Sequence, residues 1–484
     1  MRLGEKLHIL KYMILPATGI LFVLFYIQIA GADVVYSDYI RLINEYLPDV
    51  ADPSKFLVPD ILTRIPATYL ARLVNVSTFS YSVTFDRILS VLGLGLIAAC
   101  MGSYMYRHEI GFGWQTAIWI VLFSLNKWEI LLNGSAWAHM VSFGFFFVSY
   151  LLLDLVWIGE ASVKQEFLLL AMPFFMLLFA GEYIASYACT LILVCLFGML
   201  TGGANSWAGR REQTIFRHVI LSASASLVLY LFSRHYAVWE HAGATELGLR
   251  EVISRAPFFI PKFFMKTFAG AVIGQETIEN FFAPGAPLPN RAVLILGMLM
   301  ACTYVLAFLL YFRGDMLERT IFPMVLLISG FANHVLVTMG RWIFLNENYA
   351  LSSRYGGQFM IGLLGILLIF AMYERRQPSY RRRGASRRRA LKAMALLVTV
   401  CIVFGNCYTT YQEIRKAKYR EANYERMAAA LLSYEEFSPE ELAAALEWHK
   451  DPQELLNAVK ILQDNKLNVF SRPVFEEEPA PGRN

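Results

Sequence analysis

Three carboxylates follow directly after the first hydrophobic segment of the chain: Asp33, Asp38 and Glu45. A carboxylate beside a membrane is strongly hydrated and costly to strip of water, so three of them in one short stretch indicate a site. An ionised carboxylate that meets a hydroxyl group can remove its proton as a general base. We therefore predict that Asp38 or Asp33 is catalytic, without ranking the two. The alternative is a solvated loop after a membrane anchor.

A second set of polar side chains stands in or beside apolar segments further along the chain. Arg354 is followed by Tyr355 and two glycines, and Arg341 precedes it in the same loop. A guanidinium group offers a fork of donors that matches phosphate, and glycines let a ligand approach the backbone. We predict that these residues bind phosphate. The other candidates for contacts to substrate or phosphate are Glu182, His139, His235, Lys262 and Lys266.

Each of these residues also has a structural alternative. Arginines at a membrane surface can snorkel, and a polar side chain inside a bundle can serve packing alone. Lys127 and Glu129, close to His139 in the sequence, also fit a solvated turn. For Lys262 and Lys266 lipid phosphate is the favoured contact, and substrate phosphate is the alternative. The argument for a site is that the acidic and basic residues converge on one side of the membrane.

Composition indicates which elements must position these groups. The chain has 484 residues, of which 57% are hydrophobic and only 17% are charged, and its mean hydropathy is +0.46. No soluble core of this length needs so much apolar surface, so lipid surrounds most of the chain. We predict an all-α polytopic membrane protein with about 11 transmembrane helices. The predicted spans are 11–31, 86–106, 114–132, 136–157, 167–181, 184–200, 216–236, 291–312, 321–340, 354–373 and 390–411.

Two features determine the predicted topology. The apolar run 167–200 is too long for one helix, and we split it at Gly181-Glu182-Tyr183, where a glycine and a charge coincide. Lysine and arginine favour the cytoplasmic side, and the arginine-rich run 373–389 is the strongest such signal. The N-terminus is then cytoplasmic. The large segments on the outer side are 32–85, 237–290 and everything after residue 411.

Helices are also predicted outside the spans. From Asp38 to Tyr46, apolar residues recur at helical spacing, which indicates a short amphipathic helix at the membrane surface. The aromatic-rich stretch 249–268 is predicted to be a second interfacial element. The chain is thus divided into a transmembrane domain, 1–411, and a small helical extracytoplasmic tail, 412–484. Two helices of the tail begin at the capping-box patterns Ser438-Pro439-Glu440-Glu441 and Asp451-Pro452-Gln453-Glu454.

Other functional classes receive little support. The six cysteines lie in hydrophobic runs without metal-ligand spacing or a disulfide framework, so packing is their predicted role. No cofactor and no metal site are predicted, and a divalent cation stays an open alternative. The run 373–389 is a short loop, for which we expect contact with lipid headgroups and not with nucleic acid. Its arginines favour the bacterial inner membrane, with the endoplasmic reticulum as the alternative.

In these features the chain resembles the GT-C superfamily of polytopic glycosyltransferases. The resemblance rests on Asp33 and Asp38 just after the first span, the amphipathic helix that follows, the paired short spans around Gly181-Glu182-Tyr183, Arg354-Tyr355 at a helix start, and a soluble tail. It covers most of the membrane region as architecture. It implies a polyprenyl-phosphate-linked sugar as donor, an active site on the extracytoplasmic face and a catalytic acid in the first outer loop. That loop has no adjacent Asp-Glu pair here.

The resemblance implies sugar transfer with inversion. The carboxylate would activate an acceptor hydroxyl, which displaces polyprenyl phosphate, while Arg354 with Arg341 or His235 holds the phosphate. The partners would be the lipid bilayer, the lipid-linked sugar and a glycan, lipid or protein acceptor. A transporter or flippase for lipid-linked sugars is an alternative from another class, which the unequal loops disfavour. A polymerase or ligase of surface polysaccharides shares the chemistry, and no residue separates it.

Overall fold

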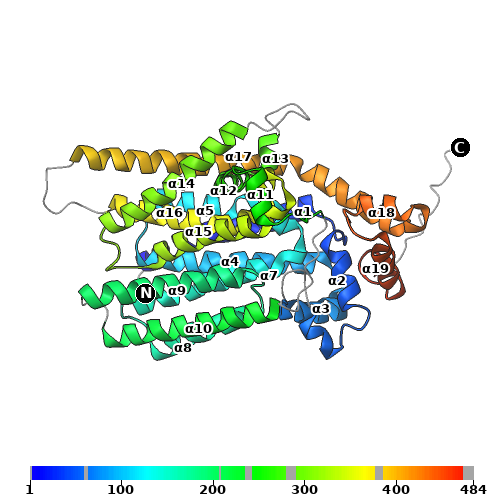
Figure 1. Cartoon of the computed structure of the whole chain (residues 1–484), viewed down its shortest axis with the longest axis horizontal. Helices are drawn as coiled ribbons and strands as arrows, with labels where there is room; N and C mark the ends of the chain where they lie inside the picture. The colour runs from blue at the N-terminus through cyan, green and yellow to red at the C-terminus, as the bar shows by residue number, and fades with distance from the viewer. Residues whose placement is uncertain are drawn as a thin grey trace.

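A computed structural model describes residues 3–58, 64–205, 209–234, 243–279, 290–375 and 385–471. These residues form helices and loops with no strand among them, which confirms the all-α prediction for the described part of the chain. The long helices lie side by side as one bundle (Figure 1). The α-helices are α1 (Leu3–Ala30), α2 (Asp38–Tyr46), α3 (Pro66–Phe79), α4 (Val83–Arg107), α5 (Phe112–Phe123), α6 (Trp128–Leu132), α7 (Trp137–Trp157), α8 (Val163–Met176), α9 (Tyr183–Asn205), α10 (Arg210–Arg234), α11 (Leu249–Arg255), α12 (Phe259–Gly270), α13 (Gln275–Glu279), α14 (Asn290–Arg313), α15 (Phe322–Arg341), α16 (Gly356–Arg375), α17 (Ala385–Leu432), α18 (Pro439–Ala445) and α19 (Pro452–Asp464). Short 3-10 helices cover Pro53–Leu57, Leu125–Lys127, Gly134–Ala136, Trp342–Phe344, Glu347–Leu351, Ser353–Tyr355, Tyr434–Glu436 and Asn468–Ser471.

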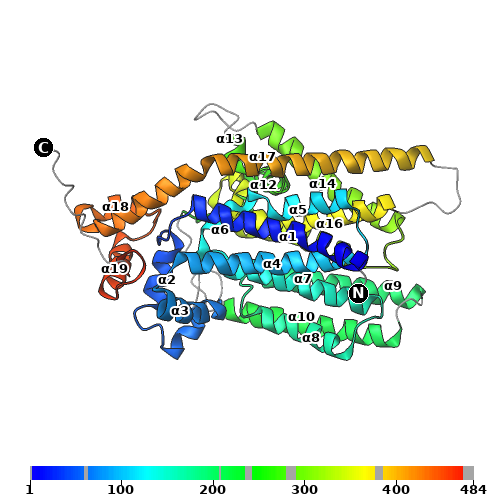
Figure 2. The same cartoon turned by 180° about the vertical axis from the view of Figure 1, so that it is seen from behind.

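Nine helices within the described ranges are long and apolar enough to cross a membrane. Their length and composition are those of an integral membrane protein. The other two predicted spans, 114–132 and 167–181, coincide with shorter helices, namely α5 with 12 residues and α8 with 14. Helix α5 packs against α16 and α17, and α8 packs against α7 and α10 at the edge of the bundle (Figure 2). The count of eleven and the orientation stay predictions.

One end of the bundle carries most of the structure outside the spans. Helices α2, α3, α18 and α19 all lie at this end, while the end of α16 and the start of α17 lie at the other end (Figures 1 and 2). Helix α17 joins the two ends. It is 48 residues long, roughly 70 Å at 1.5 Å per residue, and it continues without a break across residue 411, where we placed the start of the tail.

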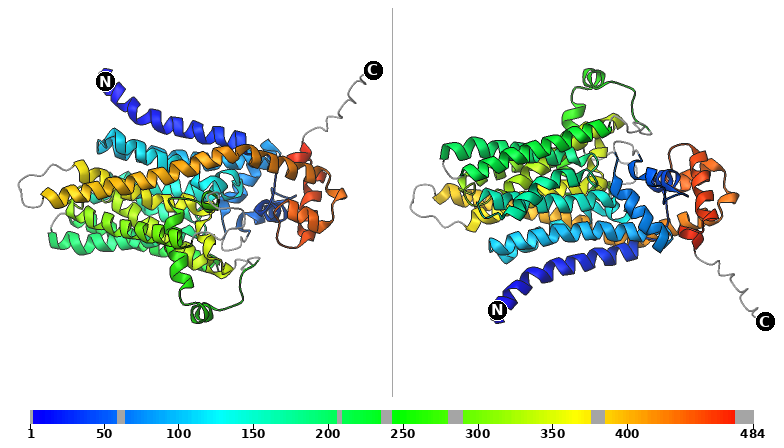
Figure 3. Two further views of the ribbon diagram at one scale, coloured as in Figure 1. Left: turned by 90° about the horizontal axis from the view of Figure 1, so that it is seen from above. Right: turned by 90° about the horizontal axis from the view of Figure 1, so that it is seen from below.

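The second large loop lies at the periphery. Seen along the other directions, α1 runs along one side of the bundle, and the segment that contains α11 projects from the opposite side (Figure 3). Leu249, Ile253 and Phe258 of this segment are exposed. Exposed apolar side chains on a short projecting element agree with the predicted interfacial role for the α11 part of the stretch 249–268. The rest of the stretch differs from the prediction, because Phe259, Phe263 and Phe268 of α12 are buried against the protein.

Several local predictions are confirmed. Helix α2 buries the face that the spacing indicated, with Tyr39, Leu42 and Tyr46 among its buried residues. The apolar run after residue 167 breaks as predicted, because α8 ends at Met176 and α9 begins at Tyr183. Gly181, between these two helices, adopts a φ of 52°, a conformation that glycine reaches at little cost.

The two tail helices also begin where the capping patterns placed them. Ser438 and Glu441 form a reciprocal capping box at the start of α18. At the start of α19, Asp451 accepts a hydrogen bond from the backbone N–H of Gln453. The starts of both helices are therefore set by local sequence.

Helices α15 and α16 approach each other through glycines. A Cβ atom added to Gly330 would lie 2.3 Å from the Cα atom and 2.5 Å from the backbone nitrogen of Gly362. The obstacle is backbone, which cannot move aside as a flexible side chain can. Small residues permit this kind of close helix contact inside a membrane.

We expect Gly330→Ala to destabilise the bundle, because overpacking a close contact costs about 1–3 kcal/mol. The control is Gly340→Ala in the same helix, where an added Cβ meets nothing within 4 Å. This control should be neutral or stabilising, because alanine is the better helix former. The measurement is the thermal unfolding temperature of the detergent-purified protein. Equal temperatures for the two variants would contradict the close contact.

Candidate functional site

A cavity of about 230 Å³ lies at the end of the bundle that carries α2. Three carboxylates and three guanidinium groups line it. These charged residues are Asp38, Glu129, Glu182, Arg41, Arg341 and Arg354. His139 and Tyr355 line the same cavity. The structure thus gathers most of the residues that the sequence singled out, although Asp38 and Tyr355 lie more than three hundred positions apart in the chain.

Arg354 is already paired. Its Nη2 and Nε atoms each lie 2.8 Å from Oε1 of Glu129. The hydroxyl groups of Ser352 and Ser353 donate to the other oxygen of Glu129, both at 3.3 Å. This network ties the start of α16 to α6, and it offsets most of the charge of Arg354.

Arg341 differs from Arg354 in this respect. It forms no ion pair with any residue in the described ranges. Its guanidinium group lies 5.9 Å from the centre of the Tyr355 ring, and the side chain is half-buried. Because a cation over an aromatic face keeps its donors, Arg341 offers this cavity the guanidinium most available to an anion. The third arginine of the lining, Arg41, pairs with Glu45 at 3.0 Å.

Asp38 is the first residue of α2 and is half-buried at the cavity wall. No hydrogen bond or ion pair to its carboxylate is found in the part of the chain that the structure describes. It follows Ser37, which has a φ of 48° and therefore a strained backbone conformation. The carboxylate is thus presented to the cavity by a sharp turn and a helix start, and it is available to accept a proton.

Asp33 has a different role in the structure and does not line the cavity. Its carboxylate accepts hydrogen bonds from the hydroxyl of Ser82 at 2.8 Å and from the backbone N–H groups of Val83 at 2.6 Å and Thr84 at 3.3 Å. These N–H groups belong to the start of α4 or precede it, and have no partner inside the helix. Asp33 therefore caps α4 from a distance of about fifty residues in sequence.

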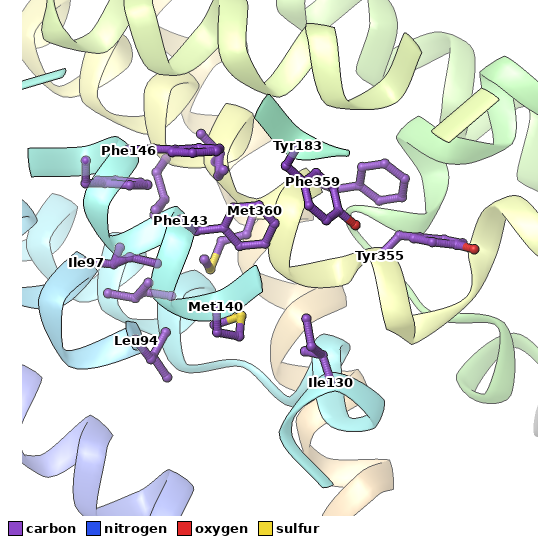
Figure 4. Packing of buried hydrophobic residues seen from close by; sticks show 14 of the residues in the cluster. Leu94, Ile97, Ile130, Met140, Phe143, Phe146, Tyr183, Tyr355, Phe359 and Met360 are labelled. Carbon is purple, nitrogen blue, oxygen red and sulfur yellow. The ribbon is translucent and has the colours of Figure 1, made fainter. Parts of the chain in front are cut away.

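Glu182 and His139 are neighbours in the wall of the cavity. The Nε2 atom of His139 lies 3.9 Å from Oε2 of Glu182, and its ring meets the Tyr183 ring edge-on at 4.8 Å. Tyr183 and Tyr355 line the cavity and also belong to the buried apolar cluster drawn in Figure 4. The polar cavity therefore borders directly on the apolar core of the bundle.

The remaining predicted residues lie elsewhere. Lys262 and Lys266 gather around Glu347, at 3.6 Å and 3.1 Å, and neither lines the cavity. Lys266 also donates to Asn290 and Asn348, and burial lowers the pKa of its amine. This cluster holds the loop between Arg341 and Arg354 against α12. His235 lies outside the described residues.

The sequence argument missed the anchor of α2. Arg72 of α3 and Asp86 of α4 form a fully buried ion pair, and the hydroxyl of Tyr39 donates to Asp86 at 2.8 Å. Tyr39 directly follows Asp38. The signal available in the sequence was that Arg72 and Asp86 each place a charged residue on the otherwise apolar face of a helix.

The tail provides a second restraint that the sequence did not indicate. The carbonyl of Leu446 accepts a hydrogen bond from the backbone N–H of Ser37 at 2.9 Å. The buried side chain of Asn468 accepts from the N–H of Val35 at 3.2 Å and donates to the carbonyl of Tyr81 at 3.0 Å. The tail therefore holds the turn that presents Asp38.

We expect Asn468→Ala to loosen this turn, because it removes two buried hydrogen bonds worth about 0.5–1.5 kcal/mol each. The φ of 50° at this position adds strain for alanine. The measurement is hydrogen–deuterium exchange of the amides of residues 34–40, which should become faster. The control is Asn465→Ala, whose exposed side chain bonds only within α19. Unchanged exchange in both variants would contradict the role of Asn468.

No group of three or more histidine, cysteine, aspartate or glutamate side chains is placed to hold a metal ion in the described ranges. The cavity can supply a proton acceptor, cations for an anionic ligand and hydrogen-bonding groups. No protein-family model matches this chain, and no curated protein or solved structure matches it significantly.

Proposed function

We propose that this protein is a membrane glycosyltransferase of the GT-C type, which moves a sugar from polyprenyl phosphate to a hydroxyl group of a glycan, lipid or protein acceptor. The observation that supports the proposal most is that Asp38 lines the same cavity as Arg341 and Arg354. This transfer needs a base for the acceptor and cations for the departing phosphate. The cavity offers both.

The proposed reaction is a single displacement. The acceptor hydroxyl gives its proton to the carboxylate of Asp38 while its oxygen forms a bond to the anomeric carbon of the sugar. The bond from that carbon to the phosphate oxygen breaks, and polyprenyl phosphate leaves with the electron pair. Attack from the side opposite to the leaving group inverts the anomeric carbon.

We assign the phosphate first to Arg341, because its guanidinium is not neutralised by a carboxylate in the described part of the chain. Arg354 supports it from within the pair with Glu129. Because the attractive energy of a cation is shared among its anionic partners, a paired arginine contributes less to binding a phosphate. Glu182 and His139 are then left to orient the sugar by hydrogen bonds.

We further propose that α5 and α8 complete eleven crossings, with the N-terminus in the cytoplasm of a bacterial cell and the cavity on the extracytoplasmic side of the inner membrane. With this count, α2, the loop between α15 and α16, and the tail share one compartment. The lysine and arginine bias of the sequence supports the orientation.

Asp38→Asn should reduce sugar transfer by about 100-fold or more, because the amide cannot accept the proton. Asp33→Asn is the matched control, since asparagine is as good a helix cap as aspartate, and transfer should stay within a few-fold of the unmodified protein. The measurement is cell-free transfer from a set of radiolabelled polyprenyl-phosphate hexoses and pentoses to envelope extract. Full activity of Asp38→Asn would overturn the assignment of the base.

The orientation can be tested with two single cysteines. Gly111 and Gly248 have negative φ angles, and a Cβ at either position meets nothing within 4 Å, so both cysteine variants should fold. A membrane-impermeant maleimide added to spheroplasts should label Gly248→Cys at once and Gly111→Cys only after lysis. The unmodified protein, whose cysteines lie in hydrophobic helices, gives the background. The reverse pattern would overturn the proposed orientation.

A further inference from the structure

A second cavity of about 100 Å³ lies beside the first. The two cavities share three residues of their walls: Glu129, Asn133 and Arg354. The second cavity therefore lies against another side of the Glu129–Arg354 ion pair. Its remaining wall comes from Trp128 of α6, from the loop before Asp38 and from the tail, chiefly the part of α17 beyond residue 418.

The two cavities differ in the chemistry of their linings. Leu42, Ile65, Ile130 and Phe344 give the first cavity an apolar wall. The second cavity has no aliphatic side chain in its lining, which consists only of polar, charged and aromatic residues. An apolar wall suits the lipid-linked end of a donor, whereas a wall of hydrogen-bonding groups suits a polar ligand.

The cations of the second cavity are neutralised inside the protein. Arg354 pairs with Glu129, and Arg420 pairs with the buried Glu413 at 2.6 Å while its guanidinium covers the Trp128 ring at 3.2 Å. Because each arginine has a carboxylate partner, the cavity does not present an excess of positive charge to a phosphate. This argues for an uncharged polar ligand.

Hydrogen-bonding capacity remains in the walls. The buried indole N–H of Trp128 has no hydrogen-bond partner in the part of the chain that the structure describes. Glu447 stands at a φ of 55° and brings a carboxylate to the cavity wall. Asn423 brings an amide from α17. Donors and acceptors in one small space are what a ligand with several hydroxyl groups can satisfy.

We propose that this second cavity is a binding subsite for the sugar hydroxyls of a glycan acceptor, and that the tail is its outer wall. The proposal rests on the proposed function, since it assigns the acceptor to one side of the Glu129–Arg354 pair and the lipid-linked donor to the other. An acceptor held there would approach the first cavity past Ser37 and Asp38.

The test separates transfer to an acceptor from transfer to water. The variants are Asn423→Ala and Glu447→Ala, with Glu425→Ala as the control on the exposed side of α17. Each protein is given polyprenyl-phosphate sugar, first alone and then with increasing amounts of glycan extract from the envelope of a strain that lacks the protein. The two readouts are free sugar released by hydrolysis and sugar transferred to the extract.

We expect both variants to raise the half-saturating amount of extract by about fivefold, which corresponds to one lost hydrogen bond. Hydrolysis of the donor should stay within twofold, and the control should match the unmodified protein in both readouts. A parallel fall of transfer and hydrolysis, or no change in either, would overturn the subsite.

Hydrogen–deuterium exchange tests the subsite even if the protein shows no transfer or hydrolysis activity. Glycan extract should slow hydrogen–deuterium exchange of residues 419–424 in the unmodified protein and have a smaller effect in Asn423→Ala. If the protein neither transfers nor hydrolyses but shows this protection, the proposed function fails and the subsite stands. Absence of protection overturns the subsite whatever the activity is.

Discussion

Arg72 and Asp86 form an ion pair that is buried on all sides, and the position of α2 depends on it. Breaking one partner of such a pair leaves an uncompensated charge and typically costs about 3–5 kcal/mol. Tyr39 adds its hydroxyl to the same carboxylate. The interaction therefore joins α2, α3 and α4 at the end of the bundle where the cavity lies. It also holds Tyr39, the residue next to Asp38, in place.

The cavity itself is organised by charge. Its three carboxylates and three guanidinium groups come from several elements, with Asp38 and Arg41 both from α2. Glu129 pairs with Arg354, and Arg41 pairs with Glu45. The pair of Glu129 with Arg354 is central, because it closes the gap between α6 and α16 and forms a wall of both cavities. Arg341 remains outside these pairs, so it is the guanidinium of the lining most available to an anionic ligand.

Local rules predicted much of what the structure contains. The spacing from Asp38 to Tyr46 predicted an amphipathic helix, the glycine at 181 predicted a break, and Ser438 with Glu441 predicted a capping box; all three are present. Each depends on residues within one or two turns of each other. The number of membrane crossings is harder, since the predicted spans 114–132 and 167–181 correspond to helices of only 12 and 14 residues.

Contacts between distant parts of the chain could not be predicted in the same way. Asp33 and Asp38 have the same chemistry and are five positions apart, yet only the fold shows that the first caps α4 and the second lines the cavity. Likewise, nothing near Asn468 in the sequence indicates that its amide reaches Val35 and Tyr81. Such pairings depend on how whole helices pack, which periodicity along the chain does not report.

Helix α17 begins at the end of the bundle opposite the two cavities and continues as one unbroken helix to the wall of the second cavity. Because the helix is long, a small tilt about one end moves the other end by several ångströms. A tilt of roughly 3° about one end displaces the other by ~4 Å, which is more than the length of a hydrogen bond. A displacement at the end of the bundle where α17 begins can therefore alter the width of a cavity at the opposite end through the rigidity of one helix.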